Sequence, residues 1–158
     1  MNSLAVYYHR QHAPLCWTLY VLAIAFLIIA GVLINVPAQS FVSLIFIVTG
    51  GVTLILAASF HHLTVAAEID RLSISFGPLP LFRRTVKYDQ IISASMDRTT
   101  LLEGWGIHPS PRGGWIWNLW GRDCIKLQLQ RGTLRVGTDD AENLVAFVNG
   151  KLLNGAAV

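Results

Sequence analysis

The chain has 158 residues, of which 53% are hydrophobic and 13% are charged, and its formal net charge is +3. Roughly a quarter of the residues in an ordinary soluble domain are charged, so this composition excludes a simple water-soluble globule. With two cysteines and no glycine triplet repeat, the chain is neither a disulfide-stapled scaffold nor a collagen. The charges are unevenly placed, because none lies between Arg10 and Glu68.

Two uncharged apolar segments, residues 15–36 and 41–60, follow a short N-terminal segment, residues 1–14. A helix rises about 1.5 Å per residue and the hydrocarbon core is about 30 Å thick, so each segment is long enough to cross a bilayer. Backbone amides find no water in lipid, which favours helix for both. Pro37 interrupts helix between them. The sequence therefore predicts a transmembrane helical hairpin within residues 15–66.

The basic residues predict the orientation of this hairpin. Arg10 precedes the first apolar segment, four basic residues follow the second, and the short connection has none. The positive-inside rule then places both termini of this multi-pass membrane protein in the cytoplasm. An alternative is that residues 1–40 form a secretory signal, although 22 uncharged residues exceed the usual 7–15 of a signal's apolar region.

Small residues lie at intervals along both apolar segments. Ala23 and Ala30 are seven residues apart in the first, and Gly50, Thr53 and Ala57 are three and four apart in the second. Such positions give a helix a smooth face against which a neighbour can pack closely. We expect the two helices to meet on these faces.

From Glu68 onward the apolar residues alternate with polar ones, which is typical of strands with one wet face. We expect about seven strands, near residues 72–76, 82–92, 93–100, 105–108, 115–120, 125–130 and 133–136. Turn residues such as proline and glycine separate them.

The clearest local feature is a hairpin with a predicted two-residue turn at 131–132. This turn pairs Leu129 with Leu134 and Leu127 with Val136. Both apolar sets then fall on one face, so the turn length agrees with the alternation.

A helix is predicted after the last strand. Asp139 can cap it, and Glu142 completes an Asp-x-x-Glu variant of the capping box. The helix should end near Gly150. The predicted fold is therefore α+β: a helical hairpin, then a domain of residues 67–158 in which an antiparallel β-roll is closed by a C-terminal helix, as in pleckstrin-homology (PH) domains.

Several motifs also resemble those of small two-span bacterial membrane proteins that carry a PH-like domain. The matching segments are FGPLPLF (76–82), GWGIH (104–108), GW (114–115), NLWG (118–121), the Asp-Cys pair (123–124) and GTDDAENL (137–144). This family has no established activity, so the resemblance implies a fold and a setting in a bacterial inner membrane rather than a reaction.

The candidate binding residues are aromatic and basic. Tryptophans, with His108 beside them, can pack in the core, lie against lipid headgroups or line a ligand groove, and three basic residues follow the first strand near an anionic leaflet. The candidates for partner or lipid binding are Arg83, Arg84, Lys87, Trp105, His108, Trp115 and Trp117, with Trp120 in the same tryptophan group.

Histidines flank the apolar segments: His9 and His12 before the first, His61 and His62 at the end of the second. Haem or a metal ion could use two of them, but neighbouring histidines on a helix point about 100° apart and no carboxylate or cysteine accompanies them at ligand spacing. We therefore expect no cofactor and treat these side chains as interfacial groups.

No nucleophile elbow, phosphate loop, zinc-protease motif or dinucleotide fingerprint occurs in the sequence. The expectation is a non-enzymatic, membrane-tethered scaffold that binds a membrane protein or peptide segment and no nucleic acid. The alternatives are a lipid-headgroup sensor and a membrane redox or haem protein that uses the histidines.

Overall fold

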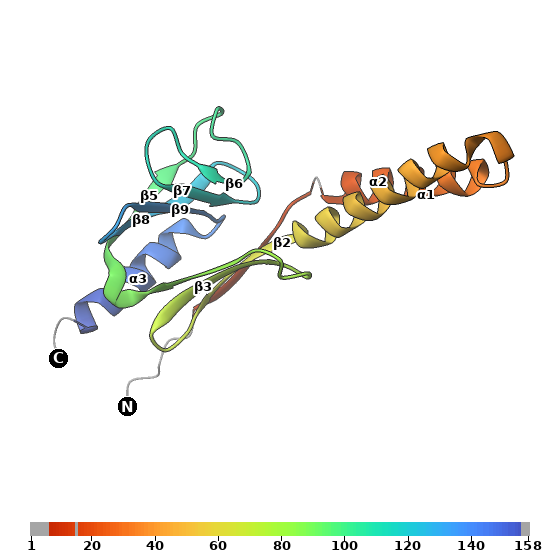
Figure 1. Ribbon diagram of the computed structural model, residues 1–158. Helices are drawn as coiled ribbons and strands as arrows, with labels where there is room; N and C mark the ends of the chain where they lie inside the picture. Colours follow the sequence, from red (N-terminus) through yellow and green to blue (C-terminus); the bar gives the residue numbers. More distant parts are fainter. Residues whose placement is uncertain (1–6, 15, 156–158) are drawn as a thin grey trace. The chain divides into compact units, whose positions relative to one another are not determined.

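The computed structural model describes residues 7–14 and 16–155 and divides the chain into two compact units (Figure 1). The helical unit consists of Ala13–His61 and Phe76–Phe82. The β unit consists of Met1–His12, His62–Ser75 and Arg83–Val158. Together they form an α+β chain with two apolar helices near its N-terminus.

Two antiparallel helices dominate the helical unit. They are α1 (Cys16–Leu33) and α2 (Ser40–Ser59), joined through the short 3-10 helix η1 (Pro37–Gln39). The segments Cys16–Leu33 and Pro37–Ser59 have mean hydropathies of 2.5 and 2.4, and both are long and apolar enough to cross a membrane. The predicted pair of apolar helices is confirmed.

Small residues let α1 and α2 pack closely, as their spacing predicts. Ala23, Ala30 and Ala57 are buried between the helices. A Cβ atom on Gly50 would lie 2.9 Å from Cδ2 of Leu27, closer than real Cβ contacts. The absence of a side chain at Gly50 therefore sets how closely the two helices approach.

Nine strands form two sheets in the described part of the β unit (Figure 1). The four-stranded sheet has the order β1 (Tyr8–His12), β2 (His62–Ala67), β3 (Arg71–Gly77), β4 (Arg83–Lys87). The five-stranded sheet has the order β5 (Ile91–Arg98), β8 (Asp123–Leu129), β9 (Thr133–Gly137), β7 (Trp115–Asn118), β6 (Gly106–Pro109). The seven strands expected after residue 67 are present as β3 to β9.

The strands β1 and β2 were not predicted. They lie directly before α1 and after α2 in the sequence, and they pair antiparallel with Tyr8 opposite Ala66 and His12 opposite His62. Helix α2 ends at Ser59, so His62 opens a strand instead of ending a helix. No local pattern revealed β2, because it is short and its partner β1 lies on the other side of the hairpin in the sequence; its residues Leu63 and Val65 are buried.

The predicted register of the last hairpin is wrong by two residues. Leu127 pairs with Leu134, and the chain reverses through residues 129–132. A two-residue turn of the favoured type needs positive φ at both central positions. Here only Gly132 has it, at +89°, and no described non-glycine residue does. A shift of two residues keeps the apolar side chains on the same face, which is why alternation alone did not reveal it.

The expected all-antiparallel pairing is also corrected, since β7 and β9 run parallel. The hairpin of β6 and β7 is inserted between β5 and β8 in the sequence and joins the sheet beside β9. The backbones approach closely where β7 begins: a Cβ on Gly114 would lie 2.1 Å from the carbonyl oxygen of Thr133. Gly114 also has φ +82°, so a larger residue does not fit there.

Helix α3 (Ala141–Gly155) packs against β5, β8 and the 3-10 helix η2 (Tyr88–Gln90). The predicted cap at Asp139 is wrong by one residue. The helix begins at Ala141, so the residue directly before it is Asp140. It also continues through Gly150 instead of ending there. Gly150 lacks the positive φ that ends helices at glycine, and Val148 on the inner face is fully buried. Packing of the apolar face sustains the helix past this glycine.

Candidate functional site

The loop that follows β5 presents apolar side chains to solvent. Leu101 and Leu102 are 82% and 94% exposed, and Trp105 after them is 49% exposed. Exposed leucines scattered singly are common, but two adjacent ones beside an exposed tryptophan form a patch. We call Leu101, Leu102, Trp105 and Trp120 the tryptophan patch.

A shallow groove of about 370 Å³ lies within this patch. The rings of Trp105 and Trp120 lie 4.4 Å apart between centroids and are tilted by 31°. The indole Nε1 of Trp105 donates to the carbonyl oxygen of Gly121 at 3.1 Å. The groove is lined by Thr99, Thr100, Leu101, Gly104, Trp105, Trp120, Gly121 and Arg122.

The loop is held in shape by a buried carboxylate. Glu103 is only 2% exposed although its neighbours in the loop are open to solvent. Its Oε2 accepts from the backbone N–H of Thr100 at 2.7 Å and from Nη2 of Arg112 at 2.7 Å. Its Oε1 accepts from Nε of Arg112 at 3.0 Å and from the hydroxyl of Ser110. This two-pronged arginine–carboxylate pair ties the loop to the segment between β6 and β7.

The electrostatics agree with a permanently ionised Glu103. Its hydrogen bonds from Arg112 hold the pKa of the carboxyl far below its usual range, against the opposing effect of burial. Ser110 and the N–H of Thr100 act in the same direction.

A second ion pair, between buried Arg135 and half-buried Asp97, supports the same region. Nε of Arg135, a residue that is 4% exposed, lies 2.8 Å from Oδ2 of Asp97. Burial by itself raises the pKa of Asp97, but the hydrogen bonds from Arg135 and from the backbone N–H of Arg98, together with the charge of Arg112, outweigh it and lower the pKa. These polar contacts hold the loop in one conformation. A loop that is already ordered loses less conformational entropy when a partner binds.

Of the seven candidate residues, only Trp105 lines this groove. Trp117 is 8% exposed and packs in the interior, whereas Trp115 on the same strand is 46% exposed. Nδ1 of His108 lies 3.0 Å from the carbonyl oxygen of Pro109. The tryptophan group thus contains both core residues and surface residues.

The three basic candidates lie on β4, on two faces. Arg83 and Lys87 share one face and Arg84 lies on the other, because strand side chains alternate. Nη2 of Arg83 forms an ion pair with Glu68 at 3.0 Å and also donates to the hydroxyl of Ser73. Arg84 is half-buried, and this burial lowers its pKa. The structure therefore does not gather these three cations into one cluster.

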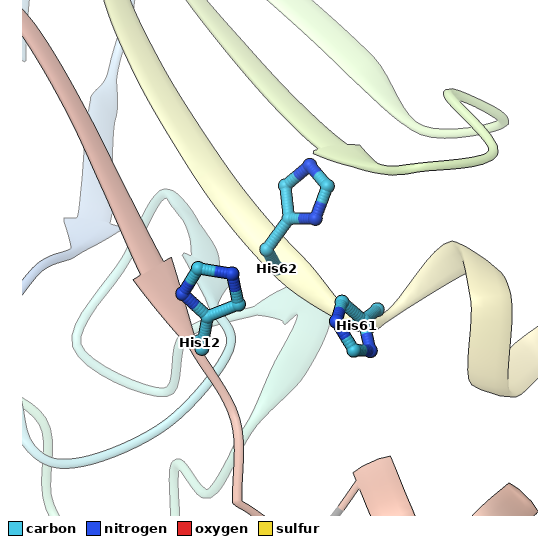
Figure 2. Close-up of side chains that lie close together, drawn as sticks. All are labelled: His12, His61 and His62. Atoms are coloured by element: carbon cyan, nitrogen blue, oxygen red, sulfur yellow. The ribbon is translucent and has the colours of Figure 1, made fainter.

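The four histidines that flank the apolar helices in the sequence have different partners. The imidazole of His9 pairs with the carboxylate of Asp139, which therefore contacts β1 instead of capping a helix. His12 and His62 face each other across β1 and β2, with His61 next in the chain (Figure 2). Nδ1 of His61 lies 3.1 Å from Sγ of Cys16, within the helical unit.

Both cysteines are buried and neither forms a disulfide. Burial raises the pKa of Cys124 to about 12, so this thiol is protonated and unreactive at neutral pH. It lies on β8, between β5 and β9 in the sheet, opposite Asp97 and Gly137 in the register.

Sequence reasoning missed the loop residues Leu101, Leu102 and Glu103. One signal was present, since two adjacent leucines interrupt a stretch that has no strand alternation. No comparable signal marked Glu103, because its partner Arg112 lies nine residues away in another loop and only the fold brings them together.

Comparisons with known proteins add no identification. A scan against protein-family models finds no match, and a search of curated proteins finds no similar sequence.

Proposed function

We propose that this protein is a non-enzymatic binding module, anchored in a bacterial inner membrane by α1 and α2, whose β unit binds an apolar segment of a membrane protein at the tryptophan patch. The hydropathy of the two helices supports the anchor. The basic residues outside them support cytoplasmic termini.

The order of the strands supports a PH-like domain. When the inserted β6–β7 hairpin is set aside, seven strands remain, four in one sheet and β5, β8 and β9 in the other, followed by α3. In the sequence, α1 and α2 then fall between the first two strands of the domain, and the tryptophan patch falls beside the second insertion.

The observation that carries the binding function is the exposure of Leu101 and Leu102 on a loop fixed by buried Glu103. Full burial of a leucine contributes about 1.5–3 kcal/mol, so covering both stabilises a complex appreciably. The surface of the groove is mostly apolar, which suits an apolar segment more than a charged headgroup. Membrane anchoring raises the local concentration of a partner, so a small patch suffices.

The test is photo-crosslinking in native membranes. A photoreactive amino acid replaces Leu102 in the full chain, and the matched control replaces Leu153, which is 74% exposed on α3. We expect a protein adduct from position 102 that is lost when Trp105→Ala is added, and none from position 153. Adducts to lipid alone, or equal protein adducts from both positions, would contradict the proposal.

A further inference from the structure

The strands that flank the helical hairpin in the sequence carry a pair of opposed histidines. His12 is the last residue of β1 and His62 is the first of β2, and the two are direct partners in the antiparallel register. Their ring centroids lie 5.8 Å apart and their planes are tilted by 53°. Each offers a ring nitrogen, and these nitrogens lie within 4.8 Å of each other (Figure 2).

This arrangement follows from strand geometry. Directly opposed residues of an antiparallel pair project from the same face with their Cβ atoms about 4.5–5.5 Å apart. Two imidazoles at this separation reach a common point between them, since zinc–nitrogen bonds are about 2.0–2.1 Å long. His12 is exposed and His62 is half-buried, so water and a metal ion have access to the pair. Small rotations of the two side chains can bring their ring nitrogens to bonding distance from one ion.

We propose that His12 and His62 form a binding site for a divalent transition-metal ion, with zinc as the probe. Neutral imidazole is a preferred ligand of zinc, copper and nickel, whereas magnesium and calcium prefer oxygen. Water fills the remaining coordination positions, as it does in zinc sites with an open position.

A metal ion at this pair has a structural consequence. It links the two strand ends from which α1 and α2 depart in the sequence, and so it closes the loop that contains the whole hairpin. Because the folded strand pair presents both ligands together, binding stabilises the β1–β2 pairing by mass action. The site lies apart from the tryptophan patch in the sequence and does not depend on the proposed partner.

The test uses the full chain in mild detergent, first stripped of metal with a chelator. Zinc is titrated in competition with a chromophoric indicator, and one ion per chain is expected to bind with micromolar or tighter affinity. His12→Ala and His62→Ala should each weaken binding at least about tenfold. His108→Ala, which removes an imidazole from β6, is the matched control and should leave the affinity unchanged.

A second measurement guards against variants that simply misfold. X-ray absorption of the zinc-loaded wild-type chain should show at least two imidazole ligands at about 2.0–2.1 Å. A first shell with fewer than two imidazoles would overturn the proposal. So would millimolar binding, or wild-type affinity in either histidine variant.

Discussion

At the scale of single residues, the most informative group is Glu103. Arg112, Ser110 and the N–H of Thr100 surround its carboxylate, and these contacts shape the loop that exposes Leu101 and Leu102. A buried acid is costly unless its hydrogen bonds are satisfied. The hydrogen bonds of the Glu103 carboxylate are satisfied. The loop conformation that exposes the two leucines therefore depends on these buried polar contacts.

This geometry predicts a pH-dependent stability. The folded-state pKa of Glu103 lies below its ordinary value of 4.5, so its contribution is complete above that pH and is lost progressively as the pH falls further. Glu103→Gln should lower the stability at pH 7 by about 2 kcal/mol, because charged hydrogen bonds are lost. Thermal unfolding of the full chain in detergent at pH 7 and pH 3 measures both effects.

The deficit of Glu103→Gln relative to wild type should shrink at pH 3, where the wild-type chain begins to lose this contribution. Glu142→Gln, an exposed change in the first turn of α3, is the control and should be nearly neutral at both values. A Glu103→Gln deficit that is constant with pH, or absent, would show that this ion pair does not stabilise the loop.

At the scale of the elements, α1 and α2 pack through small residues instead of interlocking large ones. A Cβ atom on Gly50 would press against Leu27 and the backbone of Ala23, whereas a Cβ atom on Gly51 would meet no described atom within 4 Å. Of these two neighbouring glycines, Gly50 is closely packed against the other helix and Gly51 has open space beside it. The spacing of small residues indicated the face, and the packing shows which glycine matters.

The two glycines provide a matched pair of variants. Gly50→Ala forces Leu27 to shift and should destabilise the helical unit by about 1–3 kcal/mol relative to Gly51→Ala. Unfolding of the two full-length variants in the same detergent compares them directly. Equal stabilities would mean that this close contact does not limit the packing of α1 on α2.

At the scale of the whole molecule, the proposal of a membrane-anchored module with both ends on one side rests on the charge distribution and on two helices that are long and apolar enough to cross a membrane. The short connection through η1 lacks any charged residue, whereas Arg10 and the basic residues of β4 lie beyond the helices. This asymmetry is the feature that orients helical hairpins during insertion.

Cysteine labelling tests the orientation. In a Cys16→Ser, Cys124→Ala background, Gln39→Cys should react with a membrane-impermeant maleimide in intact cells. Asn154→Cys, on α3, should react only after the cells are permeabilised. Labelling of Asn154→Cys in intact cells, or protection of Gln39→Cys, would contradict cytoplasmic termini.

Local patterns were enough to find most elements of this protein. The uncharged runs indicated α1 and α2, alternation indicated β3 to β9, and an apolar spacing after Gly137 indicated α3. Each of these signals is contained within a short stretch of chain, where hydrophobic period and length reflect the environment that the segment occupies. Trp105 was likewise named as a candidate because tryptophans cluster in its segment.

Only the tertiary structure decided the remaining features. The β1–β2 pairing joins residues on either side of the hairpin, the last turn depends on which residues adopt positive φ, and β7 lies parallel to β9 through an insertion. Glu103 meets Arg112, and His12 meets His62, across separations that no local pattern spans. These contacts arise because packing and hydrogen bonding are satisfied by the whole fold, whereas a sequence pattern records one segment at a time.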